Sequence, residues 1–342
     1  MSSRWLRALT LNIVLLILAA GLSVAVGAVT IPLKDLGRLL WHAVRGLPAP
    51  QDVPSYYATI VFDLRLPHAA LVLLAGSALG SSGAAYQGVF RNPLADPYLL
   101  GVASGAGLGA VVALSLAWPQ TQGGMFGLPA AAFLGAVVTV ALVYALARVD
   151  GTVPATTLIL AGVAVGALAT ALTSFLMLQS EGTLRRAMTY LMGGAPLGGW
   201  APVLAMLPYW LVGQAVLLAS GHALNVLQFG EEQAQQLGLH AQRAKTVILA
   251  AASLTTAAAV AFAGIIGFIG LVVPHIVRLL WGEDYRWEIP LSLLGGGTAL
   301  LLSDLLARTL LAPQTLPVGI VTALFGAPFF LWVLQRTKRQ AA

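Results

Sequence analysis

The sequence lacks cysteine and has few charged residues. None of its 342 residues is cysteine, which excludes disulfide bonds, thiol catalysis and metal sites with cysteine ligands. Charged residues make up only 9% of the chain, whereas hydrophobic residues make up 58%. With a mean hydropathy of +0.87, the chain is too apolar for a soluble protein of this length. We therefore expect most of it to lie in a lipid bilayer.

Motifs for nucleotide binding and for hydrolysis are also missing. No glycine is followed by lysine, so the chain has no phosphate-binding loop of the form G-x-x-x-x-G-K-[ST]. It has neither HExxH nor GxSxG, and its five histidines are scattered. We therefore predict no catalytic residue, no metal site and no cofactor bound by this chain.

The basic residues are placed as in a membrane protein. The net charge is +6, but Lys and Arg stand singly at the ends of apolar runs rather than along one polar face, which disfavours nucleic acid as a partner. A bilayer core of about 30 Å needs roughly 20 apolar residues per helix, which leaves room for about ten helices. Splitting the sequence at Pro, Gly and charge clusters predicts spans at 11–30, 67–90, 98–117, 128–148, 155–178, 201–220, 243–264, 267–281, 289–307 and 316–334.

An even number of spans places both chain ends on one side, and their basic residues make that side cytoplasmic. The first span follows Arg4 and Arg7 as in a signal peptide, but its length favours a retained helix. This topology assigns to cytoplasmic loops the residues Arg91, Arg148, Arg243, Lys245, Arg278 and Arg286. Glycines at four-residue spacing are predicted to be helix-packing contacts: Gly76, Gly80, Gly101, Gly105, Gly109, Gly162 and Gly166.

Two long loops interrupt the apolar pattern. The segment 32–64 is predicted outside, and the segment 220–242 is predicted inside as short amphipathic helices. The inner segment contains FGEEQAQQLG, in which Glu231 and Glu232 begin a helix that Gly238 ends, a shape suited to docking in a groove. An interfacial helix is the alternative, but such helices usually carry a Lys- or Arg-rich face. The apolar residues of the segment need a partner surface: Leu224, Leu227, Phe229, Leu237 and Leu239.

Two further features lie at span ends. In RNPLADP, Pro93 and Pro97 force a non-helical turn, which at membrane depth is tolerated only where protein covers it or where it lines a cavity; an ordinary capped turn explains Asn92 almost as well. Arg65 and Arg308 are predicted at the outer interface, because an Arg deep in the bilayer costs about 2.5 to 3.5 kcal/mol. Snorkelling is the alternative for both. For Arg308 a pair with Asp304, four residues earlier, is another.

The run from Asp63 to Gly109, DLRLPHAALVLLAGSALGSSGAAYQGVFRNPLADPYLLGVASGAGLG, closely resembles the FecCD family of ABC importer permeases. The resemblance continues in LILAGVAVG, YLMGGAPLGGW, FGEEQAQQLG, GFIGLVVPHIVRL and LPVGIVTALFGAPFFLWVL. It implies an all-α fold: a polytopic membrane helical bundle of about ten transmembrane helices per subunit, as in type II ABC importer permeases. The whole chain, 1–342, would be one integral membrane permease domain with cytoplasmic coupling helices at about 222–240.

The family's functional residues carry over onto three groups of positions. Contact with the ATPase falls on Gly230, Glu231, Ala234, Leu237 and Gly238. Docking of the binding protein falls on Arg65, Arg308 and His68, where His68 stands in place of a usual second Arg and can change charge in the physiological pH range. The cytoplasmic gate falls on Asn92, Leu94, Ala155 and Thr156.

The resemblance also implies the assembly. Its partners would be a second permease copy in a homodimer, two ATP-binding subunits that use the ATP, and a periplasmic or lipoprotein substrate-binding protein. The substrate would be a metal chelate, most often a ferric siderophore in this family, with haem or cobalamin as the other candidates. The location would be the bacterial inner membrane, with both termini cytoplasmic. The alternative functions are an ion-coupled secondary transporter, which would place Asp, Glu or His near the bilayer midplane, and an intramembrane hydrolase.

Overall fold

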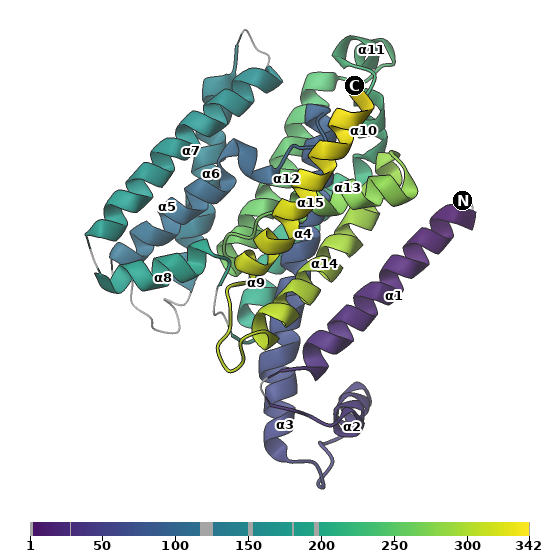
Figure 1. Ribbon diagram of the computed structural model, residues 1–342, viewed down its shortest axis with the longest axis vertical. Coiled ribbons are helices and arrows are strands. Elements are labelled where there is room, and N and C mark those ends of the chain that lie inside the picture. The colour runs from purple at the N-terminus through teal and green to yellow at the C-terminus, as the bar shows by residue number, and fades with distance from the viewer. Residues whose placement is uncertain are drawn as a thin grey trace.

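The computed structural model describes residues 3–27, 29–116, 126–149, 153–179, 181–194 and 198–341, which form a bundle of helices (Figure 1). The long helices are α1 (Ser3–Ala25), α4 (Leu66–Phe90), α5 (Val102–Ser115), α6 (Gly127–Ala147), α7 (Ala155–Leu178), α9 (Ala201–Ala219), α12 (Ala241–Ala263), α13 (Ile269–Trp281), α14 (Tyr285–Thr309) and α15 (Val318–Ala341). The short helices are α2 (Leu33–Val44), α3 (Ser55–Thr59), the π-helix η1 (Ile60–Arg65), the 3₁₀-helix η2 (Pro97–Leu100), α8 (Glu181–Leu191), α10 (Gly221–Leu227) and α11 (Glu231–Gln236).

The long helices match the predicted spans. Seven described helices are long and apolar enough to cross a membrane, and three shorter apolar helices lie at Val102–Ser115, Ile269–Trp281 and Val318–Val333. These ten segments correspond to the ten spans predicted from the sequence, so the all-α membrane fold is confirmed. The third span begins later than predicted, because η2 and Gly101, whose φ is +77°, precede α5.

The helix α4 occupies the centre of the bundle. It contacts α14, α12, α13 and α9, and nearly all of its residues are buried (Figure 1). Its many Gly, Ala and Ser residues allow neighbouring helices to approach closely, which is the main source of packing between helices in lipid. The helices α5 to α8 form a second group on one side, and α1 packs against α14 on the other.

The glycine prediction is confirmed by the packing of α4 on α14. A Cβ atom added to Gly80 would lie 2.2 Å from the carbonyl oxygen of Ser292, and one added to Gly76 would lie 2.4 Å from that of Gly296. No side chain fits at either position, so the two backbones are in direct contact. Close contacts with neighbouring backbone carbonyls surround Gly105, Gly109 and Gly162. At Gly101 the close contact is with the side chain of Thr139, and a looser contact is found at Gly166.

Much of the predicted outer loop at 32–64 is helical, contrary to the prediction, because it contains α2, α3 and most of η1. The helix α4 continues backwards through η1 and α3, so the span runs from Ser55 to Phe90, 36 residues in all. At 1.5 Å per residue it is about 54 Å long, well beyond the roughly 30 Å of a bilayer core. Pro67 lacks an amide proton, and such a loss is accommodated by local π-type adjustment of the preceding turn. The charged residues Asp63 and Arg65 made this stretch resemble a loop in the sequence.

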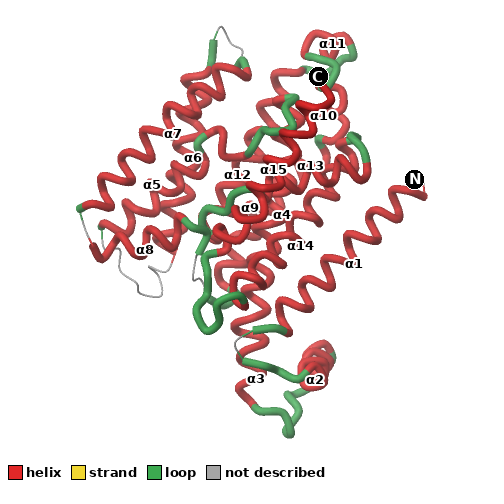
Figure 2. The backbone as a smooth tube through the Cα atoms, viewed as in Figure 1, coloured by secondary structure: helices red, strands yellow, loops and turns green. Residues whose placement is uncertain are grey.

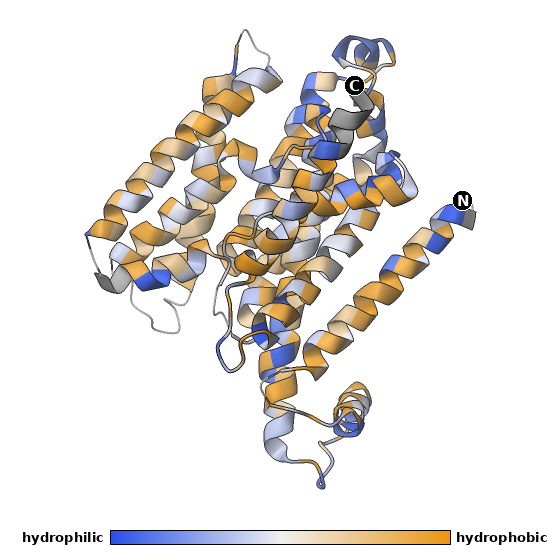
Figure 3. Ribbon diagram, in the orientation of Figure 1, coloured by the Kyte–Doolittle hydropathy of each residue, from blue (hydrophilic) through white to orange (hydrophobic). Residues whose placement is uncertain are grey.

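Hydrophobic residues cover the middle of the bundle, and hydrophilic residues gather towards its two ends (Figure 3). The N-terminal end of α1 and the C-terminal end of α15 lie at the same end as α10 and α11, whereas α2 and α3 lie at the opposite end (Figures 1 and 2). The two chain ends therefore share one side, as an even number of spans requires. The side chain of Arg4 donates to the carbonyl of Leu280 there, and Trp5 stacks on Trp287.

Candidate functional site

The predicted coupling segment is a pair of short helices at one end of the bundle. Gly230 and Gly238 bound α11, and both have positive φ, +105° and +84°, which favours glycine. Ala234 faces inward and is fully buried, whereas Leu237 is 67% exposed. Glu231 is half exposed, and one of its carboxylate oxygens lies 2.7 Å from Nζ of Lys245.

Most apolar residues of this segment do not need a partner from outside the chain. Leu224 and Leu227 are buried, and Leu239 packs beside them in the same cluster. The expectation that all five apolar residues seek an external surface is therefore wrong for these three. Phe229 and Leu237 are the exceptions, with exposed fractions of 69% and 67%. They remain as an exposed apolar pair on a polar segment.

The helix α10 is tied to the bundle by paired hydrogen bonds. Asn225 donates to the carboxylate of Asp284 over 2.7 Å and accepts from the backbone N–H of Tyr285 over 2.9 Å. The side chain of Gln228 donates to the carbonyl of Gly88 in α4 over 3.0 Å. The Arg286 guanidinium, hydrogen-bonded to Asp284, lowers the pKa of that carboxyl to about 2, so it is ionised at physiological pH. The coupling segment is thus fastened to both α4 and α14.

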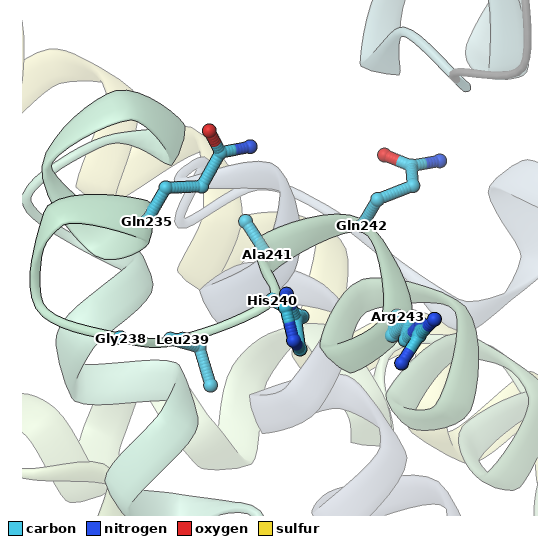
Figure 4. Close-up of a pocket in the computed structure, with 7 residues that line it drawn as sticks. All are labelled: Gln235, Gly238, Leu239, His240, Ala241, Gln242 and Arg243. Atoms are coloured by element: carbon cyan, nitrogen blue, oxygen red, sulfur yellow. The ribbon is translucent and has the colours of Figure 1, made fainter.

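An open hollow of about 520 Å³ lies beside α11, where the chain turns into α12. Figure 4 shows Gln235 and Gln242 on its two sides, with His240 and Arg243 below them. The complete lining is Gln235, Gly238, Leu239, His240, Ala241, Gln242 and Arg243. The hollow adjoins Leu237 in sequence, so it forms part of the surface available to a docking partner.

Two of the three predicted docking residues, His68 and Arg308, meet on Asp304 at the opposite end of the bundle. Asp304 accepts from Nε2 of His68 over 3.0 Å and from Nε of Arg308 over 2.8 Å. Arg308 also donates to the hydroxyl of Ser23 over 3.0 Å. The pair of Arg308 with Asp304 four residues earlier, weighed as an alternative from the sequence, is therefore present.

Arg65 caps the end of α1. Its guanidinium donates to the carbonyls of Val24, Ala25 and Val29, over 2.8 and 2.9 Å for the first two, and the residue is only 8% exposed. The last carbonyls of a helix have no partner within it, so a buried arginine that donates to them stabilises the helix end. In this conformation the charge of Arg65 faces the chain itself. Its docking role remains a prediction.

The predicted gate residues lie in two places. Asn92 accepts from the backbone N–H of Leu94 over 2.9 Å, which is the ordinary capped turn considered from the sequence. Leu94 is partly exposed and lines, with Val272 and His275 of α13, a cavity of about 10 Å³. Ala155 and Thr156 begin α7, directly after Pro154.

Sequence reasoning missed a buried polar group that joins α4, α13 and α14. Nη2 of Arg278 lies 2.7 Å from Oε1 of Gln87 and 2.8 Å from Oε1 of Glu288, whose side chain is fully buried. Gln87 also accepts, through its backbone carbonyl, the N–H of Asn92 in the gate turn over 3.1 Å. The assignment of four basic residues to loops is wrong, because they lie within helices: Arg243, Lys245, Arg278 and Arg286. Lys245 and Arg278 are also paired with acids. The only signal in the sequence was an acid ten residues after Arg278.

Comparisons with known proteins agree with this geometry. The model of the FecCD transport family matches residues 15–336. The cobalamin import permease BtuC of Halobacterium salinarum is 46% identical over 94% of this chain and 86% of its own length. The uncharacterised ABC transporter permease YvrB of Bacillus subtilis is 42% identical over 93% and 90%. The hemin transport permease HmuU of Yersinia pestis is 36% identical over 96% and 95%.

A solved structure has the same fold. It is described as an inward-facing conformation of a metal-chelate type ABC transporter, and it superposes with a TM-score of 0.80 at 31% identity, covering 97% of this chain and 99% of the other. The family match and the relatives extend over almost the whole chain. The chain is a multi-pass membrane protein and belongs to the FecCD transport family.

Proposed function

We propose that the chain is the permease subunit of an ATP-driven importer that brings a metal chelate into the cell. The observation that carries the proposal is the coupling segment: α10 and α11 present Phe229 and Leu237 outward while Asn225 and Gln228 fasten them to α14 and α4. The chain has no phosphate-binding loop, so the ATPase must be a separate subunit. A displacement of α10 would act on the two helices that carry the gate turn and the outer cluster.

The proposed assembly has two copies of this chain, two ATPase subunits and one periplasmic or lipoprotein binding protein. It would sit in the bacterial inner membrane with both termini and the α10–α11 end in the cytoplasm. The substrate would pass between the two permease copies. Arg65, His68 and Arg308 would receive the binding protein, and Asn92, Leu94, Ala155 and Thr156 would close the inner side. ATP would be used by the partner subunits, and this chain would bind no cofactor.

The proposed cargo is a ferric siderophore, with haem and cobalamin as the alternatives. The support is by analogy: relatives are named for cobalamin and hemin transport, and the solved structure is of metal-chelate type. The test is to identify the binding protein and measure which chelate quenches its fluorescence. Quenching by none of the three would refute the chelate proposal.

The double variant Glu231→Arg with Leu237→Asp tests the coupling site. It should leave the permease inserted but abolish copurification with its ATPase, because it reverses a charge and places another on the exposed apolar pair. The matched control is Leu311→Asp, an exposed leucine at the other end of the bundle. Undiminished substrate-stimulated ATP hydrolysis in the double variant would rule the coupling site out. Uptake driven by an ion gradient without nucleotide would instead favour a secondary transporter.

A further inference from the structure

The helix α2 lies across the direction of the membrane-spanning helices. In Figures 1 and 2 it is seen nearly end-on, whereas α1 and α4 are seen from the side, and it lies at the end of the bundle opposite α10 and α11. It begins only eight residues after α1 ends. A helix in this orientation, so close in sequence to the end of a membrane span, is held near the plane of the bilayer surface.

One stripe of α2 fastens it to the protein. Leu36 and Leu39 are buried and belong to the same apolar cluster as Val53, before α3, and Val61 in η1. This inner stripe explains why the segment is ordered outside the bundle. It uses only part of the apolar surface of the helix.

A second apolar stripe on α2 is uncovered. Leu33, Trp41 and Val44 are 74%, 57% and 85% exposed. Together with Gly37 they follow each other at spacings of four, four and three residues, so they share one face of the helix. No part of the described chain covers this face. Exposed apolar residues gathered on one helical face indicate a partner surface.

Basic residues border the uncovered stripe. Lys34 and Arg45 are exposed and form no ion pair in the part of the chain that the structure describes, whereas Arg38 is ion-paired with Asp52. The Arg45 guanidinium lies 4.1 Å from the centre of the Trp41 ring. In Figure 3 the hydrophilic residues of α2 lie on the side turned away from the bundle. A tryptophan with a neighbouring cation, next to aliphatic side chains, fits the boundary between phosphate headgroups and acyl chains.

We propose that α2 is an interfacial anchor, with Leu33, Trp41 and Val44 inserted at the acyl boundary of the leaflet opposite α10 and α11. Lys34 and Arg45 contact lipid phosphates. The charge layout favours lipid over a protein partner, because an amphipathic helix with basic residues beside its apolar face is the usual design of a membrane-surface helix. The anchor fixes the height of the outer cluster of Arg65, His68 and Arg308 relative to the lipid. The inference does not depend on the cargo or on the ATPase.

The absence of cysteine makes a direct test simple. Val44→Cys is labelled with an environment-sensitive NBD fluorophore and reconstituted in phosphatidylcholine–phosphatidylglycerol vesicles that contain a lipid with a shallow nitroxide quencher. The matched control is Gln51→Cys, which is exposed but lies beyond the helix. We expect blue-shifted emission at position 44 and quenching several-fold stronger than at position 51. Equal, unquenched emission at both positions would overturn the proposal and leave the stripe for a protein partner.

A second measurement tests the role of the charges. Replacing both Lys34 and Arg45 by Gln in the labelled Val44→Cys chain should reduce quenching in anionic vesicles while changing it little in neutral ones. Charge contacts with lipid phosphates are also screened by salt, so the difference should shrink at high ionic strength. Unchanged quenching in anionic vesicles would refute the contact of these two residues with lipid phosphates.

Discussion

The functional side chains at the two ends of the molecule differ in direction: those at one end project outward, and those at the other turn inward. At the coupling end, Glu231 stays half exposed and Phe229 and Leu237 project outward, so the surface is ready for a partner. At the outer end, Arg65 and Arg308 turn inward to the end of α1 and to Asp304. A partner can therefore reach Phe229 and Leu237 directly. At the second it must compete with internal contacts or rely on other residues.

The same two helices connect these ends. The helix α4 follows Arg65 at one end and leads into the gate turn at the other, and α14 begins after Asp284 and has Arg308 in its last turn. They are in backbone contact in between, at Gly76 and Gly80. A substitution in the middle should therefore destabilise both ends, whereas a substitution at one end should leave the folded structure of the other end intact.

The largest effect is expected from Gly80→Leu. Its side chain would have to displace the backbone of Ser292, because an added Cβ would already lie 2.2 Å from that carbonyl oxygen. We expect a loss of about 3 kcal/mol or more in unfolding free energy, at the upper end of overpacking costs. Thermal unfolding and size-exclusion chromatography in detergent measure it. Gly21→Leu is the control, since nothing lies within 4 Å of its added Cβ; equal behaviour of the two variants would contradict the packing account.

Asp304→Ala should disrupt the contacts of Arg308 and His68 at the outer end and leave the coupling end unchanged. It leaves the Arg308 charge partly buried without its acid and removes the acceptor of His68, and breaking a buried pair in this way costs about 3 kcal/mol. The unfolding temperature should fall, while copurification with the ATPase should persist in the protein that remains folded. Asp63→Ala, at an exposed acid of η1, is the control. A variant that lost the ATPase before it lost the fold would show that the ends are not independent.

Asn225→Leu should weaken the coupling end alone. It removes the bonds to Asp284 and to the N–H of Tyr285, one of them to a charged group, at a cost of about 2 kcal/mol. Because α11 would remain exposed, ATPase binding should survive, but transport per ATP hydrolysed should fall. Transport and hydrolysis are measured together in proteoliposomes. Gln236→Leu, at an exposed glutamine of α11, should keep the normal ratio of transport to ATP hydrolysis. If Asn225→Leu also kept that ratio, the hydrogen bonds of Asn225 would not transmit movement from α10.

The smallest effect is expected from Lys245→Met. The ion pair with Glu231 is short, but the carboxylate is half exposed, and such pairs are worth less than about 1 kcal/mol. Methionine also suits the buried position of the lysine stem. Hydrogen exchange of the α11 amides should become slightly faster, with the unfolding temperature nearly unchanged. A large loss of stability would mean that Lys245 supports more than α11.

The sequence was sufficient for the ten spans, for the glycine contacts and for the short helices of the segment 220–242, because these follow from local composition and spacing. It was insufficient for side-chain direction. Lys245 and Arg278 looked like loop residues, and only their acids, 14 and 10 residues away, allow them to be buried. The partner of His68 is 236 residues away in sequence. Hydropathy alone also did not distinguish the central α4 from the peripheral α7, since both are apolar on all sides.

The length of α4 and its tight crossing with α14 have a mechanical consequence. A straight helix of 25 residues is about 37 Å long, and the contact at Gly80 divides it unequally, with the longer arm on the outer side. If that contact acts as a fulcrum, a rotation of about 10° would shift the outer tip by roughly 4 Å and the inner tip by roughly 3 Å in the opposite direction. Movements of α4 at the two faces of the membrane would then be coupled and opposite in direction.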